Sequence, residues 1–124
     1  MSETSFISFY LKTNTIRVFK RAIKNIEYPS YVRFLIHPIN LQIAMTAYNK
    51  KKLTSFRVPI RLLNDETNAS LCIHSKRLCT LVSRKMGWES EKSYRIPGRR
   101  IMGKKAFVFY LKEAYEVTRK ENSE

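Results

Sequence analysis

Apolar residues in this chain first alternate and then change to helical spacing, and this happens twice. In the first case Ile16 and Val18 alternate with their neighbours as in a short strand, and residues 20–26 then place apolar side chains at helical spacing. Pro29 prevents that helix from continuing, and a β-branched and aromatic run follows over 31–36. After His37-Pro38, a turn dipeptide, alternation resumes at Leu41, Ile43 and Met45. The pattern predicts strand, helix and hairpin over residues 15–48.

The second half of the chain reads as a stretched copy of this unit. Ile16 and Val18 match Leu71 and Ile73, which lie 55 positions later, whereas Ile43 matches Phe109 at an offset of 66. A longer second helix and a longer hairpin tip would absorb the difference, and insertions at such places are tolerated. The alternative is chance, because any two amphipathic strand-helix-hairpin stretches align in a similar way.

The predicted fold class is α+β, with six to eight mostly antiparallel strands and two main helices. Two βαββ units, an internal pseudo-repeat, would form an antiparallel sheet or barrel. The 124 residues make a single domain, with pseudo-repeats at 15–48 and 71–111, a linker at 61–70 and a flexible tail from about residue 113. Residues 6–11 add an early strand, and residues 93–97 form a strand before a basic hairpin tip at 97–105.

The clearest helix is expected from Lys76 to Met86. Ser75 is placed to cap its first turn, and Gly87 ends it. Its predicted inward side chains are Leu78, Leu81, Val82 and Met86.

The charge balance indicates an anionic partner. Lys and Arg number 24 against 10 acidic residues, which gives a net charge of +14. Such an excess goes beyond what solubility requires and costs stability through self-repulsion. His37 and His74 have no carboxylate or cysteine partner at a catalytic spacing, so both are interpreted as structural or surface residues. The sequence predicts no catalytic residue, metal site or cofactor, and therefore no enzyme.

Cys72 and Cys79 are the only cysteines, and their spacing does not match a metal motif. We interpret both as buried free thiols in a reducing compartment, with a disulfide or a metal site left open as alternatives. The chain shows no charged-then-apolar leader, and its longest apolar runs are too short to span a bilayer. We expect a cytoplasmic protein that does not enter the membrane.

Basic residues occur as adjacent pairs near predicted turns and helix ends. The first pair of each unit falls at the start of a helix, where charge and backbone donors together could meet a phosphate. The pairs at the second hairpin tip could enter a groove of duplex DNA. For any single pair, a solvated surface is the alternative. The pairs are Lys20-Arg21, Lys76-Arg77, Arg84-Lys85, Arg99-Arg100 and Lys104-Lys105.

The order of strand, short helix opened by Lys-Arg, and hairpin resembles the AbrB-like swapped-hairpin family of small bacterial DNA-binding proteins. Residues 16–45 match, and residues 71–111 match more loosely. The resemblance implies two interlocking copies of the unit in one barrel, here a single-chain pseudo-dimer. It also implies DNA contacts at Arg17, Lys20, Arg21 and Lys24 in the first copy and at Lys76 and Arg77 in the second. The whole chain is also similar in appearance to small uncharacterised proteins of phages and mobile elements in Gram-positive bacteria.

The function expected from these patterns is non-enzymatic nucleic-acid binding by a small regulator or phage accessory protein. Double-stranded DNA is the expected ligand, and the protein would act as a monomeric pseudo-dimer or a homodimer. A second hypothesis is a phage or mobile-element inhibitor that docks on a host nucleoprotein or nuclease. The two differ in a simple observation, because a DNA binder retards unrelated duplexes at low salt without any protein partner.

Overall fold

The computed structural model describes residues 4–60, 62 and 70–117. Within them the chain forms two α-helices, one 3₁₀ turn and nine strands, one strand more than the six to eight that the sequence predicted. The helices are α1 (Lys20–Asn25) and α3 (Lys76–Met86), and the turn is η1 (Leu111–Glu113). The strands are β1 (Thr4–Tyr10), β2 (Thr15–Phe19), β3 (Tyr31–His37), β4 (Gln42–Tyr48), β5 (Ser55–Arg57), β6 (Ser70–His74), β7 (Ser93–Arg100), β8 (Ala106–Tyr110) and β9 (Tyr115–Val117).

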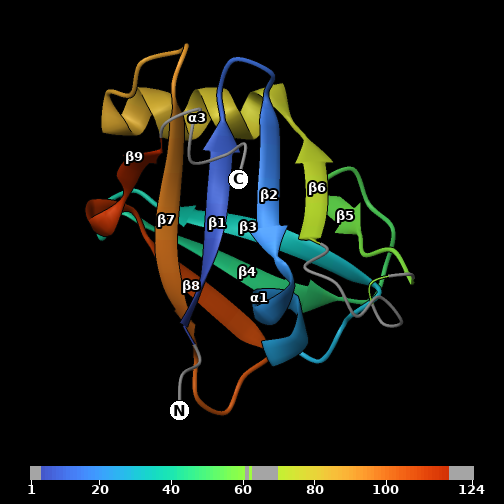
Figure 1. The fold of residues 1–124 in the computed structure, drawn as a ribbon. Helices are drawn as coiled ribbons and strands as arrows, with labels where there is room; N and C mark the ends of the chain where they lie inside the picture. The colour runs from blue at the N-terminus through green and yellow to red at the C-terminus, as the bar shows by residue number, and fades with distance from the viewer. Residues whose placement is uncertain (1–3, 61, 63–69, 118–124) are drawn as a thin grey trace.

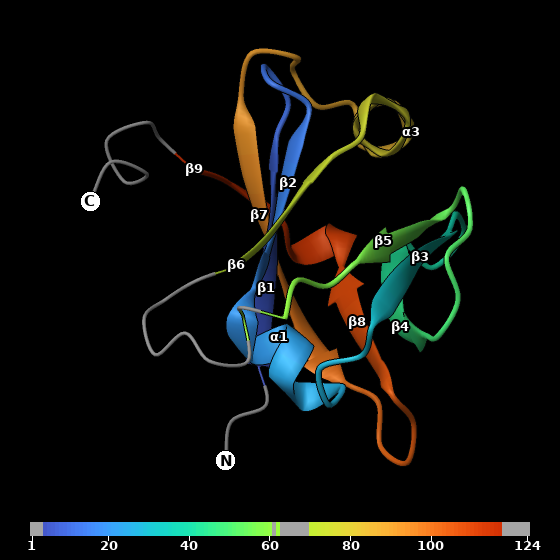
Figure 2. The same cartoon turned by 90° about the vertical axis from the view of Figure 1, so that its right-hand side faces the viewer.

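All nine described strands belong to one antiparallel sheet in the order β5-β3-β4-β8-β7-β1-β2-β6, with β9 alongside β7. The sheet coils until it nearly closes, so that β7, β1, β2 and β6 form one layer and β8, β4, β3 and β5 cross behind them (Figures 1 and 2). Helix α3 lies at one end of this two-layered body and α1 at the other (Figure 2). The α+β class and the antiparallel pairing are thus confirmed.

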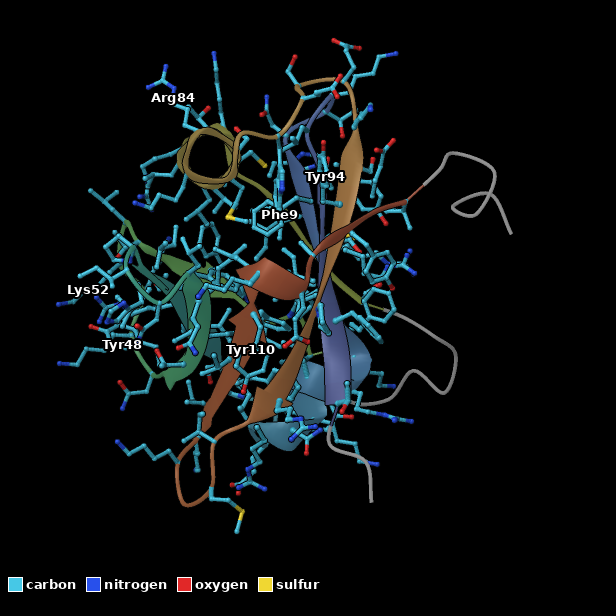
Figure 3. The ribbon with its side chains drawn as sticks, turned by 90° about the vertical axis from the view of Figure 1, so that its left-hand side faces the viewer. Phe9, Tyr48, Lys52, Arg84, Tyr94 and Tyr110 are labelled. Atoms are coloured by element: carbon cyan, nitrogen blue, oxygen red, sulfur yellow. The ribbon has the colours of Figure 1, made fainter. Side chains whose placement is uncertain are left out.

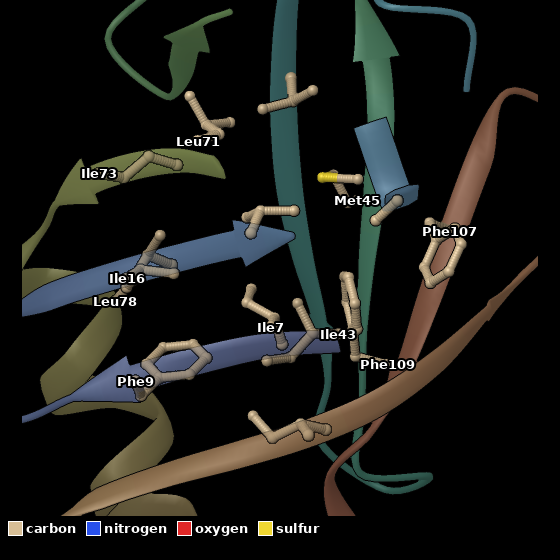
Figure 4. Packing of buried hydrophobic residues seen from close by; sticks show 14 of the residues in the cluster. Ile7, Phe9, Ile16, Ile43, Met45, Leu71, Ile73, Leu78, Phe107 and Phe109 are labelled. Carbon is tan, nitrogen blue, oxygen red and sulfur yellow. The ribbon is translucent and has the colours of Figure 1, made fainter. Parts of the chain in front are cut away.

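The hydrophobic core lies between the two layers. Inward side chains of the first layer, such as Ile7, Phe9 and Ile16, meet Ile43 and Phe109 of the second layer (Figure 4). All five are at most 2% exposed. Alternation along each strand directs one set of side chains here, as the period of two requires.

Helix α3 has the predicted boundaries. The Ser75 hydroxyl accepts a hydrogen bond from the Leu78 amide at 3.1 Å, and Gly87 ends the helix at φ 70°. The prediction that Leu81 points inward is wrong, since its side chain is 47% exposed while Cys79 is buried. Leu81 is exposed because α3 lies at the end of the two layers, where only part of its apolar face is covered.

Strand β7 is longer than predicted. The predicted strand ended at Pro97, but β7 continues through Gly98, Arg99 and Arg100, which were expected in the hairpin tip. Pro97 occupies the interval at which one edge of β7 changes partner, from β9 at residues 93–95 to β8 at residues 98–100. A proline is tolerated there because no ladder partner is needed on that edge. The exposed tip is therefore reduced to residues 101–105.

The end of the described chain forms a strand that the sequence did not predict. A flexible tail was expected from about residue 113, but Tyr115–Val117 pairs with β7 as β9. Lys92 joins this strand to the preceding loop, with its Nζ 3.0 Å from Glu89 and 3.4 Å from Glu116. Hydrogen bonds to these two carboxylates raise the pKa of Lys92. Most of the predicted linker at 61–70 lies outside the described residues.

Candidate nucleic-acid interface

The outer face of the β7-β1-β2-β6 layer carries arginines and aromatic rings. The pairing register places Arg95 beside Ser8, and Ser8 beside Arg17, in one row across three strands. Phe6 of β1 and Phe19 of β2 lie beside this row, with their rings in contact. Figures 1 and 2 show that neither described helix covers this face.

Contacts on this face hold the two arginines over one ring. The Nε atom of Arg17 donates to the Ser70 hydroxyl at 2.5 Å, and that of Arg95 donates to the Ser8 hydroxyl at 3.2 Å. Their guanidinium carbons lie 5.4 and 5.1 Å from the centroid of the Phe19 ring, within the range of cation–π attraction. The rings of Phe6 and Phe19 are 5.7 Å apart. Two planar cations and two rings are therefore fixed close together.

The charge on this face is of one sign. Alternation along the four strands places Arg99, which is exposed, on the same side as Arg95 and Arg17. The described outward positions of these strands include no acidic residue. The face therefore combines positive charge with stacking surface, and hydroxyl groups lie between them.

The hairpin tip and α1 occupy the same end of the molecule. Lys105 Nζ lies 3.3 Å from the Glu27 carboxylate, which follows α1, and this contact brings the tip beside the helix. Lys20, Arg21 and Lys24 belong to α1, and Lys20 directly follows Phe19 in the chain. Of the predicted site residues, those near this end are Lys20, Arg21, Lys24, Arg99, Arg100, Lys104 and Lys105.

The remaining predicted residues lie elsewhere. Lys76, Arg77, Arg84 and Lys85 are all on α3, at the opposite end of the sheet from α1 (Figure 1). The two helix-start pairs, Lys20-Arg21 and Lys76-Arg77, therefore lie at opposite ends of the sheet and do not line one continuous surface. Arg84 and Lys85 stand in the last turn of α3, where positive charge stabilises the helix.

Arg95, Phe19 and Phe6 were missed by the sequence reasoning. Arg95 stands alone among uncharged neighbours, and Phe19 looked like one more apolar strand residue. Only the register of β7, β1 and β2 brings them together with Arg17. Alternation within each strand was the available signal, because it places all four side chains outward.

The groups considered for catalysis or metal binding have structural contacts. His37 Nδ1 accepts from the Asn40 amide at 3.1 Å, and His74 Nδ1 lies 3.3 Å from the Thr15 hydroxyl. Cys79 is buried, which raises the pKa of its thiol to about 11, but Cys72 is exposed, contrary to prediction. Nowhere in the described ranges do three potential metal ligands come together.

The fold and this face define a basic α+β protein in which neither described helix covers the outer face of the β7-β1-β2-β6 layer. No protein-family model, no curated protein and no solved structure matches the chain. Neither described helix has the length and apolarity needed to cross a bilayer. The functional case therefore depends on the chemistry of the surface itself.

Proposed function

We propose that this protein binds nucleic acid without catalysing a reaction, and that it does so through the outer face of the β7-β1-β2-β6 layer. The observation that carries the proposal is the placement of Arg17 and Arg95 on the Phe19 ring beside Phe6. Unpaired bases stack on aromatic rings and on arginine guanidinium planes. The arginines also attract phosphates, so one patch meets both parts of a nucleotide.

Single-stranded nucleic acid fits this surface better than the duplex expected from the sequence. A duplex hides its base faces, so the rings of Phe6 and Phe19 would have nothing to stack on. Open sheets that carry aromatic residues suit single strands because every base offers a flat apolar face. We infer that the strand runs across the layer from Arg95 toward Phe19.

Phosphates beyond this patch would meet the basic end formed by α1 and the hairpin tip. Lys20 and Arg21 follow Phe19 directly, and Lys104 and Lys105 extend from the tip. These residues would attract the phosphate backbone of the nucleic acid, and such contacts carry no sequence information. The basic residues of α3 take no part in this binding, since α3 lies at the other end of the sheet.

The internal repeat belongs to the same proposal. In the β2–β6 pair, Ile16 faces Ile73 and Val18 faces Leu71. The sequence matched Ile16 with Leu71 and Val18 with Ile73, so replacing each residue of one pair by its equivalent gives the other pair. In the β4–β8 pair, Ile43 faces Phe109, and the sequence matched these two residues with each other. A two-fold repeat requires this reciprocity. If the repeat is genuine, residues 1–60 alone should associate as dimers in sedimentation, and a monomeric half would count against it.

Binding is tested by titrating a fluorescent single-stranded oligonucleotide of about 12 nucleotides at several salt concentrations. Wild type should bind it more tightly than the matching duplex. Replacing Arg17 and Arg95 together by Gln should lower the slope of log affinity against log salt by about 1.4, roughly 0.7 for each phosphate lost. Phe19→Leu should weaken binding by about 1–3 kcal/mol through lost stacking and leave the slope unchanged.

The matched control replaces Lys51 and Lys52 by Gln, which removes the same charge. Lys52 lies on the far side of the molecule from β7 and β1 (Figure 3). If this variant loses as much affinity for the oligonucleotide as the arginine double variant, only net charge matters and the sheet face is not the site. Absence of binding to any strand, or tighter binding to the duplex, would refute the proposal.

A further inference from the structure

A groove of about 590 Å³ lies between α3 and β3, away from the face described above. Its apolar lining comes from both elements and includes Phe34, Leu35, Leu78 and Leu81. Leu35 is 56% exposed and Leu81 47% exposed. Two leucines that lie open to solvent in one groove indicate an interaction surface, because a monomer normally buries such side chains when they are contiguous.

The rim of this groove is basic. Arg77, Arg84 and Lys85 border it from three positions along α3, and no acidic residue is among the described residues that line it. Figure 3 shows Arg84 projecting outward from α3 into solvent. The groove therefore offers an apolar floor along one side of a helix that carries several cations.

These features define the chemistry of the occupant. An apolar floor selects aliphatic side chains, and the positive rim selects carboxylates beside them. An amphipathic helix with leucines on one face and glutamates at its flanks satisfies both, and docking of such helices into grooves is a common form of recognition. Phosphates alone would leave Leu35 and Leu81 uncovered.

We propose that the groove between α3 and β3 binds an acidic amphipathic helix of a partner protein. The site is independent of nucleic-acid binding, because it uses neither Arg17 nor Arg95. A protein with both surfaces would hold a nucleic acid on its sheet and a protein partner beside α3. The two surfaces can therefore be removed separately.

The test uses a labelled synthetic peptide of about five helical turns, roughly 18 residues, with leucines on one face and glutamates on its flanks. Binding to the full chain is measured by fluorescence anisotropy. Leu81→Glu should weaken binding about tenfold or more, because a contact that buries a leucine is lost and a like charge is introduced. The exposed side chain of Leu81 means that the fold should tolerate this change, which a thermal melt checks.

Leu53→Glu is the matched control, since Leu53 is fully exposed at 104% and does not line the groove. The Leu53→Glu variant should bind the peptide as tightly as wild type does. Replacing Arg84 and Lys85 together by Gln should weaken binding and reduce its salt dependence. A peptide of the same composition with scrambled leucines should bind at least tenfold more weakly than the designed one.

Three outcomes would overturn the inference. Equal binding of the designed and scrambled peptides would mean that charge alone is recognised. Equal loss in the Leu81 and Leu53 variants would place the contact elsewhere. Displacement of the peptide by the single-stranded oligonucleotide would mean that the groove belongs to the nucleic-acid surface.

Discussion

Gly98 lies where β7 leaves the first layer and pairs with β8 of the second, and Gly98→Ala should be among the most damaging small substitutions in the chain. A Cβ atom built there would lie 2.4 Å from the Val108 carbonyl oxygen and 2.6 Å from a ring carbon of Phe109. Both distances are below any normal contact. The nearest atom belongs to backbone within a paired strand, so it cannot move without separating β7 from β8.

We expect Gly98→Ala to lower the free energy of unfolding by about 3 kcal/mol, the upper part of the range for overpacked cores. Urea unfolding followed by circular dichroism measures the change. Gly103→Ala is the control, because apart from its chain neighbours no described residue lies within 4 Å of its added Cβ, and only its φ of +73° is unfavourable. That conformation costs about 1–2 kcal/mol. If the two variants lose equal stability, the close approach of β8 does not constrain residue 98.

Three further outcomes test the structure. Ser75→Ala should cost about 1 kcal/mol of stability in urea unfolding, because the cap of α3 is lost; an unchanged midpoint would contradict the cap. Cys72 should react with a thiol reagent at pH 8 in the folded protein and Cys79 only on unfolding; equal reactivity of the two thiols would refute the burial of Cys79. The raised pKa of Cys79 should lower the free energy of unfolding as pH rises from about 9 to about 11, because the thiol ionises first in the unfolded chain, and Cys79→Ala should lack that loss. Glu27→Gln should change stability by less than about 1 kcal/mol, because its ion pair with Lys105 is exposed; a larger loss would show that the pair holds the hairpin tip.

The sequence alone determined the local elements with strong signals. The cap at Ser75, the helical spacing that follows and Gly87 predicted α3 with its correct ends. Alternation predicted β2, and the turn at His37-Pro38 predicted the β3–β4 hairpin. These features depend on residues close in the chain, so their physics can be read from a short window.

The tertiary structure decided what depends on distant contacts. Leu81 has an apolar side chain at helical spacing, yet the position of α3 at the end of the layers leaves it in an open groove. Gly98 looked like a turn residue, but it serves the close passage of β8. Tyr115–Val117 forms a strand only because β7 offers a free edge beside it.

The candidate site shows the same division. The sequence revealed that the chain is strongly basic and that Arg17 is one of many bases on predicted strands and helices. It did not reveal that Arg17 and Arg95, far apart in the chain, lie over one ring, because that depends on the register of three strands. Composition fixes the total charge of a protein, whereas the pairing of strands decides which charges share a surface.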